Sequence, residues 1–539
     1  MIDARAEAGA RPWWESAVIY QVYPRSFMDA DGDGVGDLAG IRARLDHLVD
    51  LGVDAMWLSP IFPSPMADFG YDVADYCAVD PVFGDLAGFD ALLAEAHWRG
   101  LRVLLDFVPN HTSDQHPWFI ASRSSRDDSR RDWYIWRDPA PGGGPPNNWT
   151  SDMGGSAWAF DEATGQYYLH AFLREQPDLN WRNPAVREAM REVMRFWFDR
   201  GVDGFRIDVL WHCIKDEGLR DNPANPAFEA WMGEKHKVLQ THSANQPEIH
   251  ELAHAMRRLA DEYGDRLLVG EICLPLDQLM HYYGTAAAPG VHLPFNFQLF
   301  EAPWDAATLA RIIREYEAAL PPGGWPNWVL GSHDSPRLAG RIGEAQARVA
   351  AMLLLTLRGT PTLYQGDEIG IGRVEIPPDR IRDPQDLRQP GLGLGRDGAR
   401  TPMAWSAGPQ GGFTRAEPWL PLHADWRSRN VATQATEPGS LLSLYRRLLA
   451  LRRQHPALAT GTIALCEAAP DVLAYTRESE AGRLFVALNL SHAPRPMPMP
   501  AGMAAECLCS THGAWPGDGA GQGALRSDEG VILRLEARP

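Results

Sequence analysis

Residues 45–60 read LDHLVDLGVDAMWLSP, and this stretch decides the fold. The leucines at positions 45, 48 and 51 recur at helical spacing. Gly52 ends that pattern, and residues 53–60 follow as an apolar run typical of a buried strand. A helix, a glycine and an apolar strand in this order indicate a unit that builds a parallel sheet.

The same unit recurs around Gly100, Gly201 and Gly359. Eight segments are candidate strands: 17–23, 54–59, 102–107, 204–208, 266–271, 291–293, 328–332 and 360–364. Eight parallel strands predict an α/β fold, a (β/α)8 TIM barrel, which places its chemistry at the carboxyl ends of the strands. An open doubly wound sheet is the main alternative. No G-x-G-x-x-G turn follows the first strand, so a dinucleotide site has little support.

The remaining segments divide the chain. Residues 111–181, after the third strand, are rich in Trp, Asp, Pro and Gly and too long for a loop, so we expect an inserted subdomain there. The barrel then occupies residues 1–110 and 182–455, with a polar excursion at 373–430. Short alternating strands in residues 456–539 predict a separate C-terminal antiparallel β-sandwich domain.

Composition excludes several classes of protein. The 539 residues are 45% apolar and carry a net charge of -19, a field that repels phosphate backbones and anionic lipid, so we expect no nucleic-acid partner. The longest strongly apolar run, residues 349–357, is far shorter than the roughly 20 residues that span a bilayer. Residues 1–11 lack the apolar stretch of a signal peptide, and we therefore expect a cytoplasmic location. The six cysteines include no C-x-x-C pair, which argues against a zinc site and a disulfide framework.

Three carboxylates stand where predicted strands end. Asp208 ends the fourth strand, Glu271 ends the fifth, and Asp334 follows the seventh. Arg206 lies two residues before Asp208 and shares its face of the strand, where its charge favours the ionised carboxylate. Retaining glycoside hydrolysis needs one charged carboxylate as nucleophile and one protonated carboxyl as acid, and Asp208 and Glu271 suit these roles.

Two other interpretations of these residues remain. An Arg-x-Asp pair by itself is more often a structural ion pair. His111 and His333, near the ends of the third and seventh strands, could join the carboxylates around a catalytic metal. No H-E-x-x-H or similar close spacing supports a catalytic metal.

The chain resembles the α-amylase family of glycoside hydrolases (family 13), and most of all its α-glucosidase and oligo-1,6-glucosidase branch. The resemblance is carried, in order, by QVYPR (21–25), GYDV (70–73), DFVPNH (106–111), QPDLN (176–180), GFRID (204–208), VGE (269–271), HD (333–334) and RTPM (400–403).

The resemblance implies a role for each matching residue. Asp208 is the expected nucleophile, Glu271 the acid/base, and Asp334 the carboxylate that holds the sugar hydroxyls. The residues implied around the terminal glucose are Tyr71, Asp72, His111, Arg206, His333 and Arg400, with Phe172 and Gln176 nearby and Arg337 as a further contact.

Three details refine this expectation. Ser332 stands where the family usually has Asn before the His-Asp pair, a change that affects only fine positioning. The motif that begins at Gln176 resembles that of enzymes that remove single glucose units from short substrates. Val209, directly after the nucleophile, resembles enzymes acting on α-1,6 bonds.

The loop at residues 29–37 reads DADGDGVGD, with acids at alternate positions and glycines that permit a tight turn. Crowded carboxylates repel one another without a cation, so we expect a structural Ca²⁺, or Mg²⁺, there. An EF-hand is rejected because its twelfth position would be Gly40 in place of a bidentate Glu. The resemblance implies Asp29, Asp31, Asp33, Asp37 and the Val35 carbonyl as ligands.

We therefore predict a retaining, exo-acting α-glucosidase that hydrolyses terminal α-linked glucose from short α-glucosides such as maltose, isomaltose or sucrose. The reaction would pass through a covalent β-glucosyl ester of Asp208 and need no organic cofactor. An α-glucosyl transferase on the same site is the alternative, and a non-catalytic sugar-binding scaffold is a different class. Linkage preference and oligomeric state stay open.

Overall fold

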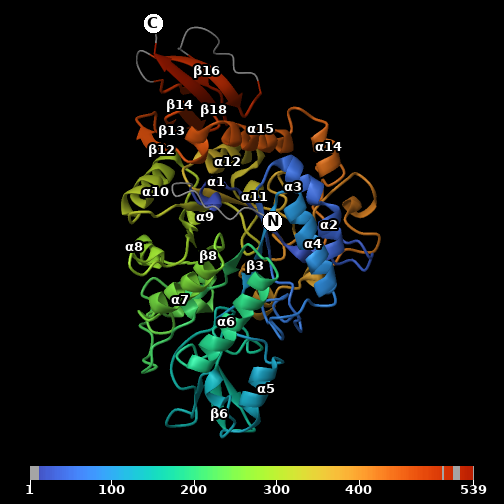
Figure 1. Cartoon of the computed structure of the whole chain (residues 1–539), viewed down its shortest axis with the longest axis vertical. Helices are drawn as coiled ribbons and strands as arrows, with labels where there is room; N and C mark the ends of the chain where they lie inside the picture. The colour runs from blue at the N-terminus through green and yellow to red at the C-terminus, as the bar shows by residue number, and fades with distance from the viewer. Residues whose placement is uncertain (1–10, 500–502, 514–522, 538–539) are drawn as a thin grey trace.

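Eight parallel strands form the centre of the computed structural model, which describes residues 11–499, 503–513 and 523–537 (Figure 1). The strands are β1 (Ile19–Val22), β2 (Ala55–Leu58), β3 (Arg102–Phe107), β7 (Gly204–Ile207), β8 (Leu267–Glu271), β9 (Leu293–Phe295), β10 (Asn327–Val329) and β11 (Thr360–Tyr364). They pair in the order β10-β11-β1-β2-β3-β7-β8-β9. A parallel bridge between Asn296 and Trp328 joins β9 to β10, so the sheet closes. The predicted (β/α)8 barrel is confirmed.

The alternation of side chains along each strand separates two cores. Trp57 and Leu104 lie in a cluster that fills the inside of the barrel, with Val269 and Phe295. Their sequence neighbours face outward into the larger core under the helices. The long helices that supply this outer core are α4 (Leu86–Trp98), α6 (Pro184–Asp199), α7 (Ile249–Glu262), α10 (Ala306–Ala319), α12 (Glu344–Thr356) and α15 (Leu441–Gln454).

The stretch that decides the fold behaves as expected. Residues 45–51 form helix α3 (Leu45–Leu51), whose leucines at 45, 48 and 51 are buried. Gly52 follows with φ 97°, a left-handed conformation that suits glycine, and turns the chain into β2. The shorter helices of the barrel and its loops are α1 (Trp13–Ser16), α2 (Leu38–Ala43), α8 (Leu276–Met280), α9 (Gln298–Glu301), α11 (Leu338–Ile342), α13 (Pro384–Arg388), α14 (Val431–Ala435) and α16 (Pro456–Ala459).

An insertion between β3 and β7 forms one end of the molecule, at the bottom of Figure 1. It contains α5 (Pro117–Ser124) and a small antiparallel sheet of β4 (Trp136–Arg137), β6 (Gln166–Leu169) and β5 (Trp158–Asp161), in that order. A bridge between His111 and Asp178 ties the two ends of the insertion together. The insertion therefore stands beside the carboxyl end of β3.

The C-terminal part lies at the opposite end and is antiparallel, as expected (Figure 1). Its five-stranded sheet has the order β12 (Thr462–Cys466), β13 (Val472–Ser479), β14 (Gly482–Asn489), β18 (Gly530–Ala537) and β16 (Met503–Ser510). One face packs against α12, and the other covers Leu525 of a two-stranded ribbon, β15 (Arg495–Pro496) and β17 (Ala524–Leu525).

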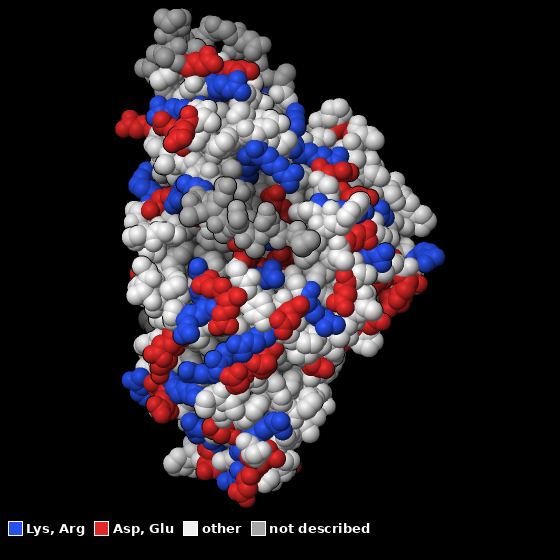
Figure 2. Space-filling view, in the orientation of Figure 1, with Lys and Arg blue, Asp and Glu red and all other residues white. Residues whose placement is uncertain are grey.

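The surface shown in Figure 2 carries basic and acidic side chains next to one another. On α6, Arg191 pairs with Glu188 and Arg195 pairs with Glu192. Across the ranges that the structure describes, no helix combines the length and apolar character needed to cross a bilayer. Residues 1–10, which bear most of the expectation about a signal peptide, lie outside the described residues.

Candidate active site

A pocket of about 480 Å³ opens at the carboxyl ends of the barrel strands. Asp208, Glu271 and Asp334, which are far apart in sequence, all line it. The barrel strands supply its floor, the insertion supplies one wall, and the polar excursion after β11 supplies another. The three carboxylates therefore meet in one cavity, as a barrel with its chemistry at this end requires.

Arg206 joins three carboxylates at the floor of the pocket. Its Nη1 atom lies 2.6 Å from Asp208 Oδ1 and 2.8 Å from Asp106 Oδ1, and its Nη2 atom lies 2.7 Å from Glu271 Oε2. The Arg206 side chain is only 2% exposed. Because one planar group holds both Asp208 and Glu271, the two carboxyl groups lie close together.

The electrostatics of this cluster favour a retained proton. Burial raises the pKa of Asp208 well above its ordinary value, and Glu271 and Asp106 add to the effect while Arg206 opposes it. Burial likewise raises the pKa of Asp106 to about 6, against the opposing Arg206 charge. Because Arg206 opposes the shift at both carboxyl groups, its guanidinium is the group that favours the ionised form of Asp208.

Val209, the residue after Asp208, adopts a left-handed backbone with φ 34° and ψ 45°. Such a conformation is unusual for a β-branched residue and stores strain of about 1–3 kcal/mol. It turns the Val209 N–H toward Glu271 Oε2, which accepts a hydrogen bond over 2.9 Å. The backbone after the nucleophile therefore also holds the expected acid/base.

Asp334 is the most accessible of the three carboxylates, with a side chain 35% exposed against 9% for Asp208 and 10% for Glu271. Arg400 Nη2 lies 2.7 Å and Arg396 Nη1 3.4 Å from its Oδ1 atom. Although burial opposes ionisation, these guanidinium groups hold the pKa of Asp334 well below its ordinary value. Asp334 is therefore a fixed acceptor that faces the cavity.

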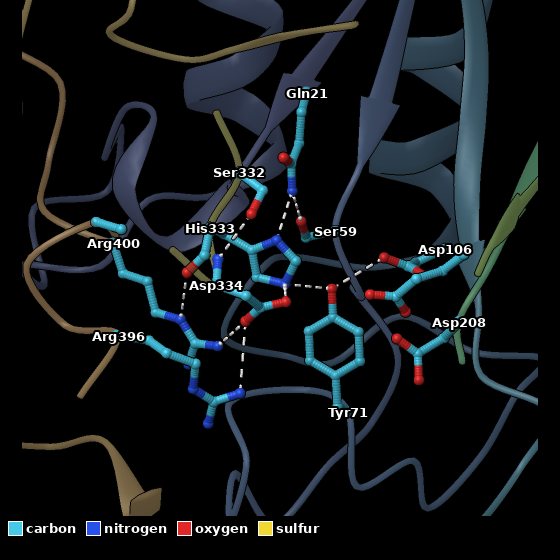
Figure 3. Close-up of polar contacts among 12 residues, drawn as sticks. Gln21, Ser59, Tyr71, Asp106, Asp208, Ser332, His333, Asp334, Arg396 and Arg400 are labelled. Atoms are coloured by element: carbon cyan, nitrogen blue, oxygen red, sulfur yellow. Dashed lines mark hydrogen bonds and ion pairs between the residues drawn. The ribbon is translucent and has the colours of Figure 1, made fainter. Parts of the chain in front are cut away.

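A chain of polar contacts links Asp334 to the floor of the pocket (Figure 3). His333 Nε2 lies 3.1 Å from Asp334 Oδ2 and 2.7 Å from the Tyr71 hydroxyl oxygen. Tyr71 in turn donates its hydroxyl proton to Asp106 Oδ2 over 3.0 Å. Burial lowers the pKa of His333 to about 3, so the ring is neutral. This chain of contacts connects Asp334 to the carboxylates around Arg206.

The insertion supplies the expected His111, Phe172 and Gln176, which all line the pocket. His111 is 1% exposed, and burial lowers its pKa to about 4. Its Nε2 atom lies 3.0 Å from the Tyr71 carbonyl oxygen, so this nitrogen donates. Gln176 donates from Nε2 to Asp68 Oδ2 over 3.3 Å. The insertion thus contributes two polar side chains and one aromatic ring to the pocket.

Three sequence-based expectations need correction. Asp72 does not line the pocket: its two oxygens accept the backbone N–H groups of Ala67 and Asp68 inside a turn. Arg337 is also outside the pocket, because it donates to the Gln365 carbonyl below the barrel rim and stacks over Tyr364. Arg400 holds Asp334 without lining the cavity itself.

Among the pocket residues that the sequence analysis did not name, Asp68 and Arg396 form an ion pair. Both line the cavity, and Arg396 Nη2 lies 2.7 Å from Asp68 Oδ1. Arg396 also binds Asp383 at 2.6 Å. Asp68 could have been identified from sequence because it lies three residues before Tyr71, an expected pocket residue. Arg396 follows a glycine-rich stretch of the excursion, and nothing local distinguished it.

The acidic loop brings three of its expected ligands together. Carboxylate oxygens of Asp29, Asp31 and Asp37 lie within 4.8 Å of one another. Asp33 is outside this group, because its Oδ1 atom accepts the Val35 N–H over 2.7 Å. Backbone N–H groups of the loop and the Thr414 hydroxyl also reach these acids. The three oxygens fit a hard cation such as Ca²⁺ or Mg²⁺.

Comparison with known proteins agrees with this geometry. The family described as alpha amylase, catalytic domain, matches residues 21–461. Over 513 residues the chain is 45% identical to the probable alpha-glucosidase of Rhizobium meliloti (strain 1021), which covers 91% of this chain and 92% of that one. It is 39% identical over 519 residues to the oligo-1,6-glucosidase of Parageobacillus thermoglucosidasius, covering 89% and 91% of the two chains.

Solved structures extend the similarity. The alpha-glucosyl transfer enzyme XgtA superposes with a TM-score of 0.92 at 42% identity, over 98% of this chain and 100% of that one. The trehalulose synthase MutB from Pseudomonas mesoacidophila MX-45 superposes with a TM-score of 0.90 at 36% identity and the same coverage. With its catalytic domain matched over most of its length, the chain belongs to the α-amylase family of glycoside hydrolases.

Proposed function

We propose that this protein is a retaining, exo-acting α-glucosidase that removes terminal glucose from short α-glucosides. The observation that carries the proposal is the shared guanidinium of Arg206, which holds Asp208 and Glu271 side by side in the pocket that Asp334 faces. Relatives named alpha-glucosidase and oligo-1,6-glucosidase support the same activity.

The pocket suits the first half of the reaction. Asp334 accepts hydroxyl protons of the terminal glucose, and neutral His111 and His333 offer further polar contacts. Asp208 then attacks the anomeric carbon while Glu271 gives its proton to the glycosidic oxygen. The bond to the leaving sugar breaks, and a β-glucosyl ester forms on Asp208. The ionised carboxylates stabilise the oxocarbenium-like transition state.

Glu271 serves the second half in the opposite direction. The carboxylate left after the first step takes a proton from a water molecule, whose oxygen attacks the anomeric carbon. The ester bond breaks, glucose leaves with its original configuration, and Glu271 regains its proton. The Val209 N–H and Arg206 hold the Glu271 carboxylate in place through both steps.

The walls of the pocket support exo action. Asp68 and Arg396 form an ion pair beside the insertion wall, where Gln176 also binds Asp68. These groups would narrow the cavity beside the terminal sugar. Structures of the relative MutB contain sucrose and isomaltulose, and maltose, isomaltose and sucrose are the substrates we propose to compare here.

The proposed activity has a direct test. Purified wild-type enzyme should release p-nitrophenol from p-nitrophenyl α-glucoside, and Asp208→Asn should reduce kcat by at least about 10⁴-fold, because the nucleophile is lost. The thermal unfolding curve of the variant serves as its control for folding. A wild-type enzyme that releases nothing would favour the sugar-binding scaffold instead.

Glucosyl transfer is the second candidate, and the 42% identity to the transfer enzyme XgtA favours testing it. The first step is the same, but a sugar or another alcohol intercepts the ester in place of water. Incubation with maltose, isomaltose and sucrose in turn, with and without an added alcohol, reports linkage preference and product together. Transfer predicts a glucosylated alcohol, whereas strict hydrolysis predicts free glucose alone.

The acidic loop is proposed to hold a structural Ca²⁺ or Mg²⁺ through Asp29, Asp31 and Asp37. A hard cation there would neutralise the repulsion between these carboxylates. It would stabilise the loop after β1 and take no part in catalysis. No organic cofactor enters the proposed reaction, and a cytoplasmic location stays a prediction.

A further inference from the structure

Lys215 is a buried cation that does not line the pocket. Its side chain is 1% exposed, and its Nζ atom lies 2.6 Å from Asp178 Oδ2 and 2.6 Å from Asn110 Oδ1. Its backbone carbonyl accepts from Arg182 Nη1 over 2.7 Å. Both ends of this residue are therefore held, and its charge is directed at two buried partners.

The contact with Asn110 decides how that amide is oriented. An ammonium group can only donate, so the amide oxygen of Asn110 must face Lys215 and its nitrogen must face the other way. That nitrogen lies 3.1 Å from Asp178 Oδ1 and 3.1 Å from His111 Nδ1. Because His111 Nε2 donates to the Tyr71 carbonyl, Nδ1 is the acceptor that Asn110 requires. Lys215 therefore determines that the amide nitrogen of Asn110 faces His111, a residue of the pocket.

The contact with Asp178 leads to the insertion wall. Asp178 is fully buried, and its Oδ1 atom accepts the Ala171 N–H over 3.0 Å. Phe172, the next residue, lines the pocket, and so does Gln176, two residues before Asp178. Asp178, the partner of Lys215, is therefore two residues from Gln176 in sequence and is hydrogen-bonded to the residue that precedes Phe172.

Lys215 itself stands in the segment after β7 that begins with Asp208. It consequently joins three stretches: the nucleophile segment, the end of β3 at Asn110, and the end of the insertion at Asp178. The pKa of His111 is lowered to about 4, mainly by burial; Asp178 opposes this shift, and the Lys215 charge contributes to it. The same contacts keep His111 neutral and oriented.

We propose that Lys215 is a positioning residue: its ammonium group fixes Asn110 and Asp178, and thereby holds His111, Phe172 and Gln176 in register with Asp208. The proposal rests on the α-glucosidase function proposed above. It assigns Lys215 no contact with the substrate. A displacement of the wall by a fraction of an ångström would weaken glucose binding and misalign the anomeric carbon.

Lys215→Met tests the proposal, because it removes the ammonium group and keeps most of the stem. In the folded enzyme we expect kcat/KM for p-nitrophenyl α-glucoside to fall about 10-fold to 100-fold, with a similar rise in the inhibition constant of glucose. Arg123→Met is the matched control. Arg123 pairs with the buried Asp161 at 2.7 Å in the same insertion, and neither residue lines the pocket. The Arg123→Met variant should have a lower Tm and an unchanged kcat/KM.

The double variant Lys215→Met/Asp178→Asn separates the positioning role of Lys215 from the loss of stability that an unpaired buried carboxylate causes. Without a buried unpaired carboxylate its Tm should return toward the wild-type value. Its kcat/KM should stay at least tenfold low, because Asn110 has still lost the donor that orients it. If Lys215→Met does not fold, the uncharged double variant provides the same readouts.

Either of two results would overturn the proposal: wild-type kcat/KM and glucose affinity in folded Lys215→Met, or full recovery of both Tm and kcat/KM in the double variant. Failure of the function itself looks different. A wild-type enzyme without glucosidase activity would refute the proposed function, while calorimetric binding of glucose to the same variants would still test the positioning role.

Discussion

The backbone N–H of Val209 donates to Glu271 Oε2 over 2.9 Å, so the residue after the proposed nucleophile is bound to the proposed acid/base. This contact requires the left-handed conformation of Val209, which a β-branched side chain resists. The arrangement is an example of local strain at a functional site, held by the surrounding barrel.

Val209→Gly should therefore stabilise the fold. Glycine adopts the left-handed conformation without strain, and the relief should exceed its entropic cost, giving a gain of about 1 kcal/mol in the free energy of unfolding. Calorimetric melting of wild type and variant measures the change. Val209→Ala is the control and should lie below Val209→Gly in Tm, and the reverse order would contradict a strained backbone.

Glu271→Gln should affect substrates unequally. The variant cannot protonate a leaving group, so the glycosylation rate for maltose should fall by about 10²–10⁴-fold. An aryl glucoside with an activated leaving group needs little protonation, and its first step should slow far less. Single-turnover kinetics with both donors measure the difference. Equal losses for the two donors would argue against the acid role.

Asp68→Asn and Asp72→Asn distinguish the two carboxylates of one turn. Asp68 faces the pocket and pairs with Arg396, so its variant should lose about 10²-fold in kcat/KM. Asp72 accepts backbone N–H groups of its own turn and does not line the pocket, so its variant should lose about 1–3 kcal/mol of stability and keep its KM within about threefold. If instead Asp72→Asn lost activity and Asp68→Asn lost only stability, Asp72 would be the sugar contact.

Asp367→Asn should change the pH dependence of stability. Burial raises the pKa of Asp367 to about 7, and its Oδ1 atom has no hydrogen-bond partner in the described part of the chain. Between about pH 4 and 7 the carboxyl is neutral in the folded protein and ionised in the unfolded chain, so wild-type stability falls as pH rises through this window.

The Asn variant does not titrate, so its Tm relative to wild type should increase from pH 4 to pH 7 and then level off. Melting curves across this range measure the difference. Asp46→Asn, at a carboxylate 81% exposed, is the control and should show no such trend. A difference that does not change with pH would contradict the assignment to Asp367.

A chelator should lower Tm if the acidic loop holds its proposed cation. A cation that binds only the folded protein stabilises it by mass action, by about 2.7 kcal/mol when present at a hundred times its dissociation constant. Asp29→Asn should have a lower Tm than wild type and no response to the chelator. Metal analysis confirms removal, and an unchanged wild-type Tm after demonstrated removal would refute the structural ion.

The barrel and the identity of its three carboxylates could be predicted from sequence because both depend on local patterns. A helix ended by glycine and followed by an apolar run specifies a βα unit whatever its neighbours are, as residues 45–58 illustrate. Asp208 and Glu271 each end such a strand, so the topology alone brings them to one end of the barrel.

Other parts of the site depend on contacts between distant segments. Asp68 and Asp72 are the same residue type and lie four residues apart, so the sequence does not distinguish them. In the folded turn Asp72 binds backbone N–H groups, whereas Asp68 faces the cavity. Arg396 comes from a loop of irregular structure, whose path no periodic pattern predicts. It reaches Asp68 because both segments pack over the same strand ends.

The sequence by itself determined which carboxylates stand at strand ends and which arginine stands beside Asp208. Only the tertiary structure decided which side chains face the pocket and which are bound to each other or to the backbone. The physical reason is range: periodicity and turn chemistry act over a few residues, whereas ion pairs such as Lys215 with Asp178 and Arg396 with Asp68 form only after the barrel has closed.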